Sequence, residues 1–142
     1  MNHSTRFTVA LHILTLLASN PGAALTSEYI AGSVNTNPVV VRRLLGTLRK
    51  VGIVSSQPGN GGGWELARDA AKVTLRDVRR AMNEGSPFSM HNRPPNILCP
   101  IGRNIQQALG RIYEQAERVM EEDLSQTTIL SLLQSVQGRG EA

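Results

Sequence analysis

The chain has one cysteine, Cys99, among its 142 residues. A single cysteine excludes an internal disulfide framework, and such sparse use fits a reducing compartment. No apolar run approaches the length of about eighteen residues that a membrane-spanning helix needs. The first residues also lack a basic region followed by an apolar block and a cleavage site. These absences predict a cytoplasmic protein.

Motifs for catalysis and for metal or nucleotide binding are missing as well. No Ser-His-Asp arrangement or pair of carboxylates in a predicted cleft can be placed, and the acidic residues 121–123 are typical of a solvated helix end. His12 and His91 lack the spacing of a metal site. No Lys-Ser/Thr follows the glycine-rich residues 59–63, so they do not form a P-loop, and their spacing does not fit dinucleotide binding. The sequence therefore predicts no enzyme.

The net charge of +4 is distributed unevenly. Through residue 80 there are ten basic and four acidic side chains, a balance of +6, whereas the remainder has five basic and seven acidic ones, a balance of −2. A basic front half suggests a polyanionic partner, and an ordinary solvated surface is the alternative. With 40% hydrophobic residues, the chain has room for one compact domain and an extension.

Two helices are predicted before residue 35. Residues 5–19 repeat apolar side chains at helical spacing, and Asn20-Pro21-Gly22 ends that helix. Thr26 can cap a second helix that runs through Val34, with Glu28 near the positive end of its dipole.

The stretch 37–50 is predicted to be a third helix, with Asn37 as N-cap and Pro38 at the first helical position. Its apolar residues recur at spacings of three and four and leave a basic outer side. The apolar stripe is Val41, Leu44, Leu45 and Leu48. Two short helices joined by a tight polar turn outline a helix-turn-helix, whose second helix lies in the DNA major groove.

A β-hairpin is predicted next, from residues 53–57 through a glycine-rich tip at 58–63 to a strand at 64–66. Thr74 and Asp77 form a capping pair for a helix over 74–83. Together these elements predict a mainly α fold with a small β-hairpin, which is a winged helix-turn-helix.

Beyond a proline-interrupted linker loop at 85–100, residues 101–124 form the longest helical pattern. Its apolar residues recur every seventh position and require an apolar partner, which a second copy of the chain would supply. The predicted dimerisation residues are Ile105, Leu109, Ile112 and Val119. We predict a winged domain at 1–84, dimerisation helices over 101–137, including a short final helix at 128–136, and a tail at 138–142.

Residues 33–82 resemble the Rrf-two family of bacterial winged-helix transcription regulators, and the similarity extends from Thr5 through the long helix. The signals are the stretch 48–54, the glycine triplet before Trp64, and Cys99-Pro100. The resemblance implies a homodimer that binds palindromic operators in double-stranded DNA, with the third helix in the major groove and the wing in the minor groove. The implied DNA-binding residues are Asn37, Val39, Val40, Arg42, Arg43, Gln57 and Asn60.

Two departures from the family pattern matter. Some relatives carry an arginine in the wing, where this chain has Pro58. Cluster-binding relatives hold an iron-sulfur cluster with three cysteines, and Cys99 alone cannot, so we expect no cofactor. Relatives with a cysteine at this place resemble sensors of oxidants or electrophiles, and a helix start favours thiolate. A buried, inert thiol is the alternative.

The sequence thus predicts a homodimeric, sequence-specific DNA-binding transcription regulator, a repressor that responds to oxidants or electrophiles through Cys99. One alternative is a small-molecule-responsive repressor with an inert Cys99 and a pocket between the winged domain and the long helix. Another is a winged-helix module that binds a protein through its basic face. Arg42 and Arg43 can contact either guanine edges or phosphates.

Overall fold

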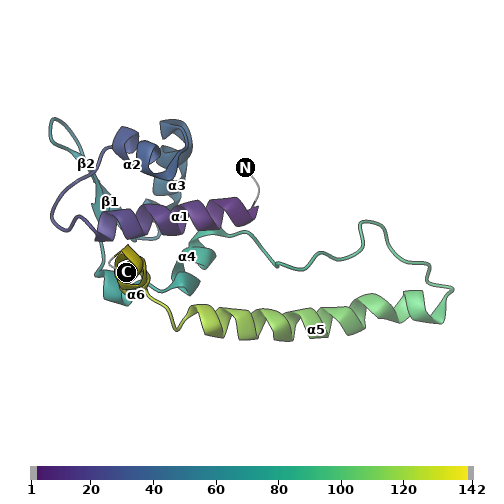
Figure 1. Cartoon of the computed structure of the whole chain (residues 1–142). Coiled ribbons are helices and arrows are strands. Elements are labelled where there is room, and N and C mark those ends of the chain that lie inside the picture. The colour runs from purple at the N-terminus through teal and green to yellow at the C-terminus, as the bar shows by residue number, and fades with distance from the viewer. Residues whose placement is uncertain (1–2, 141–142) are drawn as a thin grey trace.

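The computed structural model describes residues 3–140. Figure 1 shows a group of short helices and one hairpin, from which a single long helix projects. In chain order the elements are α1 (His3–Ala18), α2 (Ser27–Val34), α3 (Pro38–Lys50), β1 (Val54–Gln57), β2 (Gly63–Leu66), the 3-10 helix η1 (Ala70–Lys72), α4 (Leu75–Met82), α5 (Pro100–Leu124) and α6 (Ile129–Gly140). The prediction of a mainly α fold with a small β-hairpin is confirmed.

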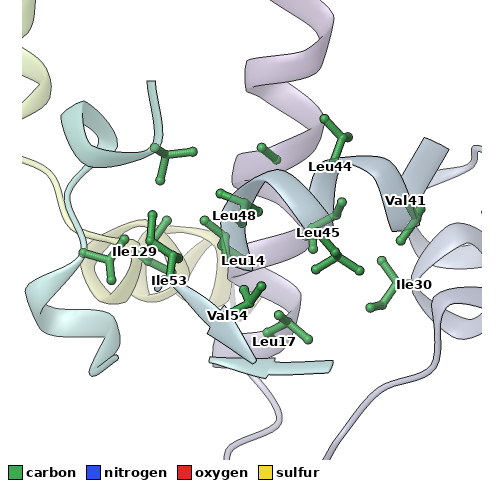
Figure 2. Packing of buried hydrophobic residues seen from close by; sticks show 14 of the residues in the cluster. Leu14, Leu17, Ile30, Val41, Leu44, Leu45, Leu48, Ile53, Val54 and Ile129 are labelled. Carbon is green, nitrogen blue, oxygen red and sulfur yellow. The ribbon is translucent and has the colours of Figure 1, made fainter. Parts of the chain in front are cut away.

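The core is centred on α1 and α3, as their apolar periodicity predicts, and buried residues of α2, β1, α4 and α6 complete it. The predicted stripe of α3 is fully or almost fully buried, and it meets the buried side of α1 (Figure 2). The α1 residues in this cluster are Ala10, Ile13, Leu14 and Leu17.

Local capping fixes where the helices begin. The side chain of Thr26 accepts a hydrogen bond from the Tyr29 N–H at 3.1 Å, and the Asn37 side chain accepts one from the Val40 N–H at 3.0 Å. The α4 capping box is present as predicted, since the Thr74 hydroxyl accepts from one backbone N–H and Asp77 accepts from another. These caps satisfy N–H groups that have no partner within their own helix.

The wing is an antiparallel pair with Val54 opposite Leu66 and Gln57 opposite Gly63. Gly63 is required because a Cβ there would lie 2.5 Å from the carbonyl oxygen of Leu25. Leu25 exchanges two backbone hydrogen bonds with Trp64, at 2.9 and 2.8 Å. This extra pairing, which sequence periodicity did not predict, fastens the wing to the start of the helix-turn-helix.

The final helix packs on the winged domain, although the sequence pattern grouped it with the long helix. Ile129 is completely buried in the core, and its N–H donates to the carbonyl of Val73 at 2.9 Å. Figure 1 shows α6 close beside α1. Periodicity identifies an apolar face but does not say which surface covers it.

The long helix α5 contacts its own domain near its C-terminal end. Arg79 lies 3.2 Å and Arg80 2.7 Å from the carboxylate of Glu121, and Arg79 also approaches Glu117 at 3.7 Å. The side chains of Arg79 and Glu121 are only 14% and 18% exposed. The expectation of a solvated helix end is therefore wrong for Glu121, because long-range packing of α4 on α5 is not visible in local sequence.

Residues 83–99 follow α5 outward without a helix or strand of their own. Phe88 stacks on Tyr113 with ring centroids 4.7 Å apart, and a Cβ at Gly102 would lie 2.6 Å from the carbonyl oxygen of Asn96. The linker thus covers one side of α5. No helix within residues 3–140 is long and apolar enough to cross a membrane.

Candidate nucleic-acid interface

The outward face of α3 is basic. Burial of the apolar stripe on one side of this helix leaves the opposite side open to solvent. Helical spacing places one apolar residue, one glycine and four basic residues on that open side. They are Val39, Gly46, Arg42, Arg43, Arg49 and Lys50. A convex helix surface with this charge suits the DNA major groove, which is wide enough to admit an α-helix.

The three arginines of α3 have different surroundings. Arg42 forms an ion pair with Glu28 of α2, with 2.7 Å between Nη2 and Oε1. Arg49 lies over the ring of Trp64, 5.4 Å from its centroid, and donates to the Ser56 hydroxyl at 3.4 Å. Arg43 forms no ion pair within the described chain, so its guanidinium is free to meet an external anion.

The predicted residues at the start of α3 occupy different positions. Val39 is 57% exposed and lies on the basic face. Val40 packs partly against the core, which places it at the edge of that face. The Asn37 side-chain oxygen already caps the helix, so the amide nitrogen is the group it can offer to DNA.

The wing contains the other two predicted contacts. Asn60 is exposed at the tip, whereas the Gln57 amide donates a hydrogen bond to the carboxylate of Glu65. Trp64 anchors the hairpin by donating from its indole N–H to the Ser27 hydroxyl at 3.2 Å. Through Arg49 and Trp64, the wing and α3 are held as one surface.

Gly46 lies at the centre of the basic face of α3. A glycine inside a helix costs about 1 kcal/mol relative to alanine. Apart from the nearby backbone of α3 itself, no atom of the described residues would lie within 4 Å of a Cβ at this position, so packing against other elements does not require the glycine. A backbone without a side chain here allows close approach by an external surface.

Cys99 is exposed and caps α5, with its Sγ 3.5 Å from the Gly102 N–H. The alternative of a buried thiol is therefore wrong for the single chain.

The space between α4 and α5, about 570 Å³, is lined by charged side chains, whereas the groove of about 550 Å³ between α1 and α6 is mainly apolar. The small-molecule alternative places its pocket between the winged domain and the long helix, and that space is the one lined by charged side chains.

Residues 3–135 match the Rrf2 family model, described as an iron-dependent transcriptional regulator. The chain belongs to the Rrf2 (Rrf-two) family. The members to which it is similar are DNA-binding transcription regulators and not enzymes, so this Rrf2 chain is a DNA-binding transcription regulator as well.

The relatives of this Rrf2 protein agree in length and fold. It is 38% identical over 130 residues to YwnA of Bacillus subtilis strain 168, a provisionally assigned HTH-type transcriptional regulator, covering 92% of this chain and 96% of YwnA. A crystal structure of a provisionally assigned DNA-binding protein shares 37% identity with a TM-score of 0.72, covering 90% of this chain and 98% of the other. A regulator structure from Lactobacillus plantarum shares 26% identity with a TM-score of 0.78, covering 95% and 91%.

The family description mentions iron, but the donor set of this Rrf2 chain does not fit such a site. Among the described residues, no three His, Cys, Asp or Glu side chains are grouped to hold a metal ion. Cys99 is the single thiol, and its surroundings offer backbone N–H rather than further ligands. These residues therefore do not support an iron-dependent function.

Sequence reasoning missed three residues of this surface. Glu28 was predicted only as a favourable charge for its own helix, and Arg49 belonged to the predicted basic outer side of the third helix without a role of its own. Both acquire their partners from distant segments, so no local signal could have found them. Gly46 did carry a signal, because a glycine in the middle of a strongly amphipathic helix has a local cost.

Proposed function

We propose that this Rrf2 regulator acts as a homodimer that binds a palindromic operator and represses transcription. The observation that supports this best is the uncovered apolar stripe of α5. None of the residues 100–124 is buried, and Ile112 and Val119 are each 60% exposed. A stripe of this kind on a projecting helix is stabilised by pairing with another copy.

The predicted dimerisation residues differ in position. Ile112 and Val119 lie on the open side, and Ile105 is half-buried beside them. Leu109 borders a hollow that it shares with Met90 and Tyr113, so it faces the linker more than the open side. We propose Ile112 and Val119 as the centre of the dimer contact.

Antiparallel pairing fits the DNA. A helix of 25 residues is about 37 Å long, and α5 carries its own winged domain at its C-terminal end. Two copies paired this way hold their winged domains at opposite ends of the helix pair. That separation is comparable to the distance of about 34 to 36 Å between major-groove faces that lie one helical turn apart on a duplex.

Within each half-site, we propose that Asn37, Val39, Arg42 and Arg43 enter the major groove, with Val40 at the edge. Gln57 and Asn60 of the wing approach the adjacent minor groove. The support is that α3 and the wing form one fastened surface whose exposed residues include most of this set. A regulator that binds chromosomal DNA must also lie in the cytoplasm, which is the location predicted from the sequence.

Footprinting on DNA upstream of the regulator's own and neighbouring genes tests the proposal. We expect a symmetric footprint with two half-sites one turn apart, overlapping the polymerase-binding region of a promoter. Ile112 is the central residue of α5, so in an antiparallel pair it lies near its counterpart. Ile112→Glu therefore places two carboxylates together and should give a monomer with at least tenfold weaker operator binding.

Gln107→Glu is the matched control, because it adds the same charge to an exposed residue on another side of α5. It should keep both the dimer and the footprint. A wild-type protein that sediments as a monomer at micromolar concentration would contradict the dimer. A footprint lying wholly upstream of the polymerase site would contradict repression.

We also propose that oxidants or electrophiles act at Cys99. The exposure of the thiol supports this, because an oxidant or electrophile in solution can reach its sulfur directly. In an antiparallel dimer the two copies of Cys99 lie at opposite ends of the helix pair. A disulfide needs the two Cα atoms within about 7 Å, so the oxidised form would be a mixed disulfide with a small thiol.

A further inference from the structure

Glu28 is a carboxylate beside the surface that meets a polyanion. Its side chain is 66% exposed and pairs with Arg42, which is 51% exposed. A negative charge here opposes DNA phosphates and weakens binding to every sequence. Stabilisation of the fold is a poor explanation, because exposed ion pairs contribute little. A benefit that arises when DNA is bound would account for placing this carboxylate beside Arg42.

The position of Glu28 relative to Arg42 is set by the backbone. The two helices pack through buried residues, with Ile30 and Ala31 on α2 and Val41 on α3. Asn35, in the left-handed conformation at φ 56°, fixes the turn between them. The carboxylate thus reaches Arg42 from a rigid base and limits the orientations that the long arginine side chain can adopt.

The ion pair changes what Arg42 can recognise. The adjacent carboxylate offsets its charge, which lowers its net attraction for a phosphate. Only one guanidinium nitrogen, Nη2, contacts Glu28, and the remaining N–H donors are available. Donors on a neutralised, oriented group suit the uncharged acceptors of a base edge, and guanine O6 and N7 accept two parallel hydrogen bonds.

We propose that Glu28 is a positioning residue that makes Arg42 a reader of one guanine in each half-site and leaves phosphate contact to the unpaired Arg43. This inference rests on the proposed operator binding. It assigns different roles to two neighbouring arginines that have the same intrinsic chemistry. Specificity at one base pair would then depend on a residue that does not itself contact DNA.

The test begins with selection of duplexes from a random pool by the full-length protein. Selection is repeated with Glu28→Gln and with Arg42→Gln, and the preferred base at each position is compared. We expect both variants to lose preference at the same single base pair of each half-site. Arg43→Gln should keep that preference and weaken binding to all duplexes. The slope of log affinity against log salt concentration should fall by about one, the value expected for one lost phosphate contact.

Affinity provides a second readout. For Glu28→Gln we expect binding to a scrambled duplex to strengthen about threefold or more, with a steeper salt dependence, because Arg42 is released to phosphates. Preference for the selected operator over the scrambled duplex should fall about tenfold. In the presence of Arg42→Gln, the Glu28→Gln change should no longer alter base preference, because Glu28 acts through Arg42.

Glu65→Gln is the control, since it removes a wing carboxylate that contacts Gln57 rather than an arginine. If Glu28→Gln and Glu65→Gln change operator and scrambled binding by the same factor, Glu28 is only a general repulsive charge and the inference is overturned. If the wild-type protein itself selects no sequence, the proposed operator binding fails first. If the wild type discriminates between sequences and Glu28→Gln keeps the same base preference, only the positioning role of Glu28 is overturned.

Discussion

Arg42, Arg43 and Arg49 lie within two turns of α3, yet each has a different environment. Arg42 is held by Glu28, Arg49 lies on Trp64, and Arg43 pairs with no acid in the described chain. A count of basic residues treats the three as equivalent. The proposed roles follow these surroundings, with Arg42 as a base reader, Arg43 as a phosphate contact and Arg49 as a link to the wing.

Cys99 provides a prediction at the same scale. Diamide with a small thiol should convert Cys99 to a mixed disulfide, in which each thiol loses one electron and one proton to the diamide. We expect the treated wild-type protein to release its operator at least tenfold more readily and to gain the mass of the small thiol. Operator binding and mass spectrometry measure the two changes.

Cys99→Ser is the control, because serine keeps a side chain that can cap α5. It should bind the operator before and after diamide with the same affinity. Equal release of DNA by both proteins would show that the thiol is not the sensor. A dimer band on a non-reducing gel would contradict the antiparallel arrangement, since it requires the two copies of Cys99 to meet.

Residue-level features were predictable from sequence where the interaction is local. Thr26, Asn37 and the pair of Thr74 and Asp77 cap the helices that they were predicted to cap. The Glu28–Arg42 contact spans 14 residues and depends on how α2 packs on α3. Charge and spacing along the chain contain no information about that packing, so the sequence left Arg42 and Arg43 with the same two alternatives.

At the scale of one element, α3 combines a strong apolar stripe with a glycine on its outer face. Gly46→Ala should raise the free energy of unfolding by about 0.5 to 1 kcal/mol, because alanine is the better helix former and its Cβ meets no atom of another described element within 4 Å. The same methyl group would lie where DNA approaches the helix. We therefore expect operator affinity to fall about tenfold although stability rises.

Thermal unfolding and operator titration measure the two effects separately. Gly138→Ala in α6 is the matched control, since its Cβ also meets nothing within 4 Å and the helix lies away from α3. This control should leave operator affinity unchanged. If Gly46→Ala binds the operator as well as the wild type does, α3 does not approach DNA closely at this position.

Element types and most bounds followed closely from periodicity and capping, and α3 begins and ends where predicted. The end of the final helix was predicted wrongly, because α6 continues to Gly140 and residues 138–140 are helical rather than a tail. What an element packs against did not follow. The helix α6 was grouped with α5, but Ile129 enters the core of the winged domain. The pairing of Leu25 with Trp64 is equally non-local, and a single bridge has no alternating pattern that a sequence could show.

At the scale of the whole molecule, the direction of α5 determines where a second winged domain would lie. Arg79 and Arg80 hold this direction through Glu121, and the Arg79 guanidinium also donates to the Gly85 carbonyl at 2.8 Å. Because α5 is long, a small rotation at its attached end moves its far end by several ångströms. In the proposed dimer, the distance between the two copies of α3 is therefore sensitive to a few contacts between α4 and α5.

Glu121→Gln should expose this sensitivity. The substitution keeps the shape of the side chain but removes the charge shared by Arg79 and Arg80, both within 3.2 Å of its carboxylate. We expect a loss of about 1 to 2 kcal/mol in stability, since Arg79 is largely buried. The dimer should persist, because the apolar stripe of α5 is unchanged.

Operator binding and half-site binding then separate orientation from chemistry. Affinity for the two-site operator should fall about tenfold, or about 1.4 kcal/mol, whereas affinity for a duplex with one half-site should stay the same. When one base pair is added or removed between the half-sites, Glu121→Gln should lose less operator affinity than the wild type does, because the looser helix tolerates altered spacing.

Glu122→Gln is the control. It removes the neighbouring charge, which contacts Gln126 instead, and should bind every duplex as the wild type does. Equal losses on one-site and two-site duplexes would mean that Glu121 supports the winged domain itself and does not set the distance between its two copies.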